Sequence, residues 1–154
     1  MKEEMVILTR SFDFLDWLMQ RALSFPRSQR FAVTQRLQDA ALDFHESIVI
    51  ANHQRTDQRL ERLEDADATL DRVRHYLRLA HRWRWLSDGQ YHHVAEMIAE
   101  LGRLLGGWIQ ETASRRQNLG RGAGPETHPR GSGRFVEQST EQRTDRQSQQ
   151  ERAR

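Results

Sequence analysis

Apolar residues recur at steps of three and four along the first three quarters of the chain, which is the pattern of amphipathic helices. We expect helices over about residues 8–24, 29–53 and 88–113, and another whose apolar stripe runs from Leu60 to Ala80. The links between them are short, so neighbouring helices should run antiparallel. The pattern therefore predicts an all-α fold, an antiparallel up-down four-helix bundle.

Each expected helix has one apolar face, and the four faces should share a core. In the first helix, Phe14 and Trp17 fall off the stripe and need a second surface. The stripe of this helix consists of Leu8, Phe12, Leu15, Leu18, Met19 and Ala22. The stripes of the other helices are Val33, Leu37, Ala40, Ala41, Phe44, Ile48 and Ala51; Leu60, Leu63, Ala66, Leu70, Val73, Leu77 and Ala80; and Tyr91, Val94, Ile98, Leu101, Leu105 and Trp108.

Local signals mark two helix boundaries. Phe25 precedes Pro26, and proline disfavours the helical conformation of the residue before it, so the first helix should end there. Ser87 followed three residues later by Gln90 is a capping box, in which the two side chains satisfy backbone amides at a helix start. The last helix should begin at this point.

The helical pattern stops near Asn118, where Gly, Pro, Ser, Gln and Arg replace apolar residues. Such a segment buries too little apolar surface to offset the entropy of ordering it. We therefore expect two parts, a bundle over residues 1–117 and a disordered tail over residues 118–154.

Composition excludes several classes of protein. The 154 residues contain no cysteine, so there is no disulfide, thiolate metal site or cysteine nucleophile. The mean hydropathy is −0.87, and no apolar run approaches the roughly 18 residues of a membrane span. The N-terminus also lacks the pattern of a signal peptide. We expect a cytoplasmic protein with no membrane partner.

Arginine dominates the basic residues, since Lys2 is the only lysine among 24 Lys and Arg residues. Arginine binds phosphate and stacks on aromatic rings, which favours a nucleic-acid partner. A GC-rich genome would produce the same bias, so the positions of the arginines must decide. The third helix and the residues after it concentrate them, interleaved with aromatic residues, at Arg72, Arg74, Arg78, Arg82 and Arg84. We expect these five to bind RNA or a partner protein; the alternative is a solvated helix face.

Two helix faces outside the core stripes suit close packing. The third helix has a second apolar stripe of Tyr76, Leu79 and Trp83, with Leu86 as a candidate fourth member, and the fourth has a flank of small residues, Ala95, Ala99, Gly102 and Gly106. Glycine inside a helix costs about 1 kcal/mol relative to alanine, so close packing is expected to compensate. We expect self-association through Tyr76, Leu79, Trp83, Gly102 and Gly106. The alternative is that the first two helices cover these faces.

No catalytic or metal-binding arrangement is evident. No Glu or Asp is followed by His at the third position, the spacing of di-iron sites in four-helix bundles. The adjacent His92 and His93 point about 100° apart on a helix, a poor chelating geometry. The glycine-rich GRGAGPE lacks the lysine and hydroxyl residue of a phosphate-binding loop. We expect neither enzyme activity nor a metal or cofactor.

Three segments of the chain, taken together in their order along the sequence, resemble those of one protein family. They are the string IAELGRLLGGWI within residues 90–109, the basic helix with Arg74 and Arg78 one turn apart, and the sequence Phe25-Pro26-Arg27. Over residues 8–112 the chain resembles the accessory variability determinant (Avd) family of diversity-generating retroelements, carried by bacteria and phages.

The resemblance implies a function. Avd proteins are four-helix bundles that form a pentameric barrel and bind the retroelement's reverse transcriptase and its template-repeat RNA. The complex makes adenine-mutagenised cDNA that diversifies a target gene. Arg74 and Arg78 match the family's basic positions, so the resemblance implies a non-catalytic accessory subunit and a homopentamer. The family is related to four-helix proteins encoded by intervening sequences of ribosomal RNA genes. The alternative is therefore a structural or adaptor oligomer without specific RNA binding.

Overall fold

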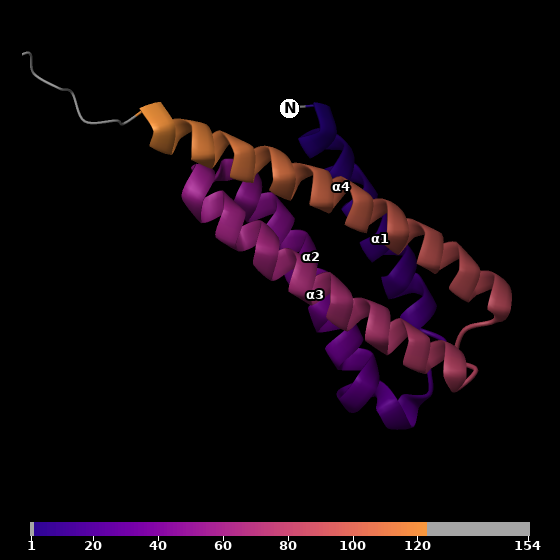
Figure 1. Cartoon of the computed structure of the whole chain (residues 1–154). Coiled ribbons are helices and arrows are strands. Elements are labelled where there is room, and N and C mark those ends of the chain that lie inside the picture. Colours follow the sequence, from indigo (N-terminus) through magenta and orange to yellow (C-terminus); the bar gives the residue numbers. More distant parts are fainter. Residues whose placement is uncertain (1, 123–154) are drawn as a thin grey trace, which may run out of the picture. The chain divides into compact units, whose positions relative to one another are not determined.

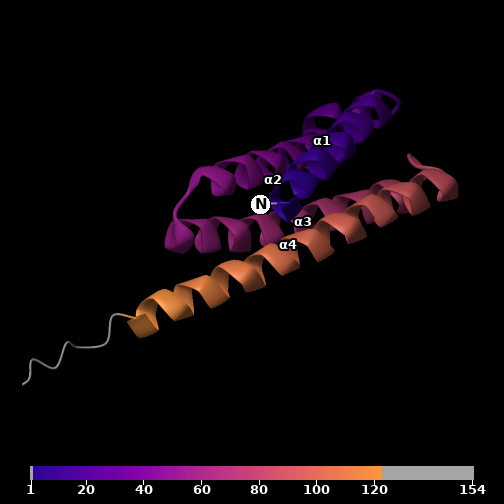
Figure 2. The ribbon, with the colours of Figure 1, turned by 90° about the horizontal axis from the view of Figure 1, so that it is seen from above.

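The computed structural model describes residues 2–122, and within them the chain is helical and contains no strand. The helices are α1 (Lys2–Ala22), α2 (Gln35–His53), α3 (Thr56–Arg82) and α4 (Asp88–Gly122). A short 3-10 turn (Arg27–Gln29) and a π-helical turn (Arg30–Thr34) precede α2. Each helix packs against the next, and α1 also packs against α4. Consecutive helices run in opposite directions (Figures 1 and 2), so the predicted four-helix bundle is confirmed.

The core stripes expected for the second, third and fourth helices are largely confirmed. Every expected core residue of α3 is buried, and so are those of α2 and α4, except that Val33, just before α2, and Tyr91 are half-buried. Thr69 and Thr112 extend the buried faces of α3 and α4. These stripes could be predicted from the sequence because almost every core position in them is apolar.

The stripe expected for the first helix is wrong in part: Leu18 and Ala22 are buried as expected, but the buried face is rotated away from Phe12. Phe14 is completely buried, whereas Phe12 is 62% exposed. The buried face of α1 consists of Ile7, Ser11, Phe14, Leu18 and Ala22. A serine interrupts this stripe in the sequence, and its hydroxyl is accommodated by two hydrogen-bonding partners. They are the Leu8 carbonyl at 3.0 Å and the His45 Nδ1 at 2.9 Å.

The last helix is longer than expected. We expected it to end near residue 113, but α4 continues to Gly122. Polar contacts support the extra turns: Arg115 pairs with Glu111 one turn earlier, and Arg116 reaches Asp57 of α3 at 3.4 Å. The expected boundary at 117/118 therefore falls inside α4. The remainder of the expected disordered tail, residues 123–154, lies outside the described residues.

The turn between α3 and α4 sets the position of the basic helix against its neighbour. The predicted capping box is present: the Gln90 amide donates to the Ser87 hydroxyl at 3.2 Å, and the Ser87 amide donates to Gln90 Oε1 at 3.0 Å. Arg84 adopts a left-handed backbone with φ of 62°, which reverses the chain after α3. No helix in residues 2–122 is long and apolar enough to cross a membrane.

Candidate nucleic-acid interface

The expected arginines do not share one face. Successive helical residues are rotated by about 100°, which separates Arg72 from Arg74, Arg78 and Arg82. Arg72 is directed toward α2, where its Nη2 lies 3.6 Å from Asp43. The other three lie on the flank of α3 that faces α4, and Arg84 lies in the turn. The structure thus brings four of the five predicted arginines to the α3–α4 side.

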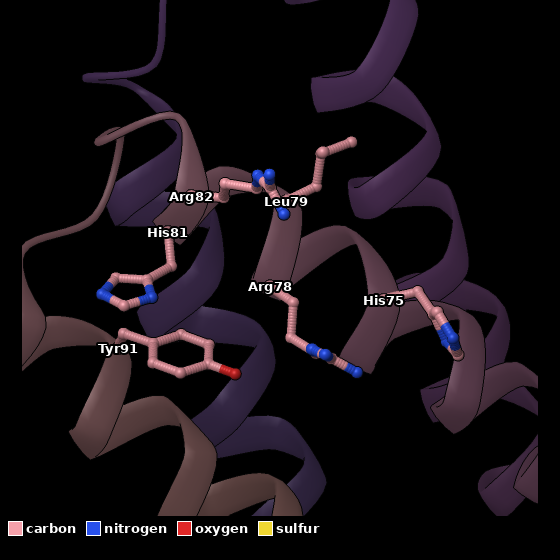
Figure 3. Close-up of a pocket in the computed structure, with 6 residues that line it drawn as sticks. All are labelled: His75, Arg78, Leu79, His81, Arg82 and Tyr91. Carbon is pink, nitrogen blue, oxygen red and sulfur yellow. The ribbon is translucent and has the colours of Figure 1, made fainter.

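Three adjoining hollows follow the seam between α3 and α4. The first, of about 370 Å³, is bordered by Arg74 and Arg78. The second, of about 390 Å³, is bordered by Arg78 and Arg82 (Figure 3). The third, of about 640 Å³, is bordered by Arg82 and Arg84. Each neighbouring pair of hollows shares an arginine, Arg78 or Arg82, and we call the three together the α3–α4 groove.

The small-residue flank of α4 forms part of this groove. Ala95 and Ala99 line the first hollow opposite the arginines. A Cβ placed on Gly102 would collide with the Arg74 Nη2, so this glycine makes room for a guanidinium of the same chain. Arg74 also pairs with Asp71 on its own helix at 2.5 Å. By contrast, a Cβ on Gly106 would meet nothing within 4 Å.

Arg78 and Arg82 are the cations best placed to receive a phosphate. Both are exposed, and among residues 2–122 neither forms an ion pair. The third hollow is less suited to anions, because it also contains the Asp88 carboxylate. The pKa of Asp88 is lowered, chiefly by the hydrogen bond from His81 and by the charges of His81 and Arg84. At neutral pH this carboxylate is therefore ionised, and it opposes an anion at the Arg84 end.

An aromatic pair that the sequence had not indicated spans the groove. The rings of His81 and Tyr91 stack with centroids 4.2 Å apart and an angle of 3° between their planes. His81 is oriented by its Nε2, which lies 2.8 Å from Asp88 Oδ1. The sequence could have predicted this contact, because residues equally distant from the turn of an antiparallel helical hairpin lie opposite each other. His81 and Tyr91 are each five residues from Leu86.

The expected oligomer-interface residues lie in different environments. Tyr76 packs against the core, Leu79 is half-buried, and Trp83 is 45% exposed beside Trp85. Gly102 lies under Arg74, and Gly106 borders open space within one chain. A second set of exposed apolar side chains lies on α1 and α2, and it includes Met5, Phe12, Leu42 and Val49. The role of the expected residues in self-association stays a prediction.

Metal-ligating side chains do not converge in the described part of the chain. Residues 2–122 contain no group of three or more His, Asp or Glu side chains arranged to hold a metal ion. His75 and His81 line the hollows of the groove, whereas His93 contacts the Trp17 ring of α1 and His92 lies 3.3 Å from Glu96.

Comparisons with known proteins agree with this fold. The family model described as bAvd-like matches residues 5–112. A crystal structure from Bacteroides thetaiotaomicron, of a protein of unknown function in the S23 ribosomal protein family, superposes with a TM-score of 0.65. The similarity covers 70% of this chain and 98% of that one at 17% identity, which shows a shared fold alone. No curated protein matches the chain.

Proposed function

Because this chain belongs to the bAvd-like family, we propose that it is a non-catalytic accessory subunit of a diversity-generating retroelement. It binds the retroelement's reverse transcriptase and its template-repeat RNA, and so supports mutagenic cDNA synthesis. The observation that carries the proposal is the α3–α4 groove, where Arg78 and Arg82 lack acidic partners among the described residues. Guanidinium groups placed in this way bind phosphates, and phosphate contacts supply most of the affinity for nucleic acid.

The RNA arm of the proposal is tested by reversing the charge of the two unpaired arginines. The double variant Arg78→Glu/Arg82→Glu should lose most of its affinity for template-repeat RNA, measured by fluorescence anisotropy. The matched control is Arg36→Glu/Arg103→Glu, which changes the net charge equally at exposed positions that line none of the three hollows. The slope of log affinity against log salt should become shallower by about 0.7 to 0.9 for each phosphate that the variant no longer binds.

Two results would support a structural adaptor instead. If both double variants weaken RNA binding equally, the effect is one of net charge, and the groove is not an RNA site. If the wild-type chain binds no RNA between low and moderate salt, the arginines are solvated and the RNA arm fails. Circular dichroism should show unchanged helicity in both variants, since exposed substitutions usually alter stability by about 0.5 kcal/mol or less.

The proposed binding to the reverse transcriptase needs a separate measurement. The reverse transcriptase of the same retroelement, co-expressed with the chain, should co-purify with the wild type and with Arg36→Glu/Arg103→Glu. Arg78→Glu/Arg82→Glu should lose this association, because an acidic patch of the enzyme would meet glutamates in place of guanidinium groups. Retention of the polymerase with loss of RNA would assign the groove to RNA alone.

The accessory subunit acts as a homopentamer in this proposal. Exposed apolar side chains on α1 and α2, together with Trp83, give it surface to bury against copies of itself. Light scattering should give a mass five times the 18.2 kDa of one chain. The variant Gly106→Leu has open space within one chain, so it should fold. If another copy packs there, overpacking of about 1–3 kcal/mol should reduce the measured mass. A stable monomer at micromolar wild-type concentration contradicts the assembly.

A further inference from the structure

The first two hollows of the α3–α4 groove have a shape and a lining that phosphate binding alone does not require. They adjoin each other and share His75, Arg78 and Tyr91. Each falls within the range of about 300–1,000 Å³ that is typical of small-ligand sites. A site that only attracts phosphates needs exposed cations and no hollow.

One side of the first hollow is apolar. Ala95 and Ala99 of α4 line it, with Ile98 and Leu77 behind them. Both alanines are exposed despite their apolar side chains, and they lie one helical turn apart on this flank. A flat apolar group can therefore lie between the helices there, and a larger side chain at either alanine would fill the space.

Flat aromatic surface lies next to this apolar wall. The His81–Tyr91 stack joins α3 to α4 across the groove. In Figure 3 the Tyr91 hydroxyl and the Arg78 guanidinium project into the same space between the helices. A nucleobase stacks on such rings regardless of its sequence, because every base has a π face.

His75 supplies a polar group for the edge of a base. Its Nδ1 lies 2.8 Å from the Asp71 carbonyl oxygen. A carbonyl only accepts hydrogen bonds, so Nδ1 carries the proton and donates it. In the neutral imidazole this leaves Nε2 as an acceptor on a side chain that lines both hollows. The amino and imino groups of bases are suitable donors to it.

These features favour a nucleotide over an acidic peptide. A glutamate or aspartate side chain would use the guanidinium groups but would gain nothing from the alanine wall or the aromatic stack. A base that remains paired in an A-form helix is also unsuitable, because duplex RNA presents mainly phosphates and 2′-hydroxyls. An unstacked nucleotide uses every part of the groove.

We propose that the α3–α4 groove holds one unstacked nucleotide of a single-stranded RNA. Its base lies on the Ala95–Ala99 wall against the His81–Tyr91 stack, and its phosphate is bound by Arg78. Arg82 binds the next phosphate along the strand. This inference rests on the RNA binding proposed above and specifies which form of RNA is bound.

The test fills the groove without changing any charge. Ala99→Leu occupies the space for the base, and Ala95→Leu is a second variant with the same purpose. The matched control is Ala68→Leu, at an exposed position of α3 that lines none of the hollows. The probes are a single-stranded RNA with one 2-aminopurine and a fully paired duplex of equal length, both at one fixed salt concentration.

The wild type and Ala68→Leu should prefer the single strand and should change the 2-aminopurine fluorescence on binding. Ala99→Leu and Ala95→Leu should lose that signal. Their single-strand affinity should fall by about 5- to 150-fold, the effect of losing one stacked base. Wild-type affinity for the single strand in Ala99→Leu and Ala95→Leu refutes the nucleotide site while leaving RNA binding by the arginines intact.

Two other results would also overturn the inference. A wild-type chain that binds neither RNA probe contradicts the proposed function itself. If the leucine variants bind single-stranded RNA normally but lose the reverse transcriptase or an aspartate-rich peptide, the groove is a protein-binding site.

Discussion

The substitution Gly102→Ala distinguishes two reasons for a glycine on the flank of α4 that faces α3. In the structure, a Cβ at this position would meet the Arg74 Nη2, then Arg74 Cζ at 3.7 Å and Leu70 Cδ2 at 3.9 Å. The obstacle is the end of a flexible side chain, which can move, and not the backbone of another helix. We therefore expect Gly102→Ala to displace Arg74 and to leave the bundle intact.

The expected change in stability follows from two opposing effects. Alanine is favoured over glycine within a helix by about 0.8–1.0 kcal/mol. Displacing Arg74 weakens its pair with Asp71, and such a pair on one helix contributes about 0.2–0.5 kcal/mol. The net result is a gain of about 0.5 kcal/mol in the free energy of unfolding, which raises Tm by about 2 °C for a domain of this size.

Thermal and urea unfolding, followed by circular dichroism at matched chain concentrations, measure this change. The control is Gly107→Ala, where the glycine is exposed and a Cβ meets nothing within 4 Å. It should gain the full helix preference of about 1 kcal/mol. RNA affinity should fall in Gly102→Ala, because the Arg74 guanidinium leaves its place beside the groove, and should stay unchanged in Gly107→Ala.

A decrease of more than about 1 kcal/mol in the stability of Gly102→Ala would count against this explanation, because backbone would then have to move to admit one methyl group. A fall in oligomer mass with unchanged helicity would show that a second chain packs against Gly102. Either result would restore the close-packing role that the sequence suggested for this glycine.

Three further predictions concern the fold. Phe14→Ala should lower the free energy of unfolding by about 3–5 kcal/mol in urea unfolding, whereas the exposed Phe12→Ala should change it by less than about 1 kcal/mol; equal losses would contradict the assigned core face. Ser87→Ala should cost about 1 kcal/mol by removing the capping box, and no change in the urea midpoint would contradict that. Burial lowers the pKa of His45 below 6.5, against a smaller raising effect of the Glu46 charge. The unfolded chain therefore binds the proton more readily, so stability should fall as pH decreases below 6.5, and His45→Gln should remove this dependence.

Local sequence patterns were enough to place the helices and most of the core. In α2, α3 and α4 the apolar residues recur at helical spacing with few interruptions, so the buried face was evident before any tertiary contact was known. The capping box was equally local, because its hydrogen bonds join residues three positions apart. Family membership also needed only the sequence, because the match to the bAvd-like family over residues 5–112 is a match of sequence. These residues lie within the helices and the short turns between them.

Long-range contacts decided the face of α1 and the length of α4. Ser11 is accommodated in the core because its hydroxyl hydrogen-bonds to His45, more than thirty residues later, as well as to the Leu8 carbonyl. Periodicity assigns a serine to the surface, so it favoured the stripe through Phe12 over the one through Phe14. The end of α4 is similarly supported by a contact with α3, through Arg116 and Asp57.

At the candidate site, too, the sequence predicted the separate parts, and only the tertiary structure decided how they meet. The arginines of the third helix and the small residues of the fourth were both recognisable in the sequence, but they suggested unrelated roles, RNA binding and self-association. The turn after Arg82 places the two flanks side by side, and Arg74 then lies over Gly102 while Arg78 faces Ala95 and Ala99. Helical periodicity gives the direction of each side chain about its own axis. The packing of α3 against α4 determines which directions meet, and so the groove exists only in the folded bundle.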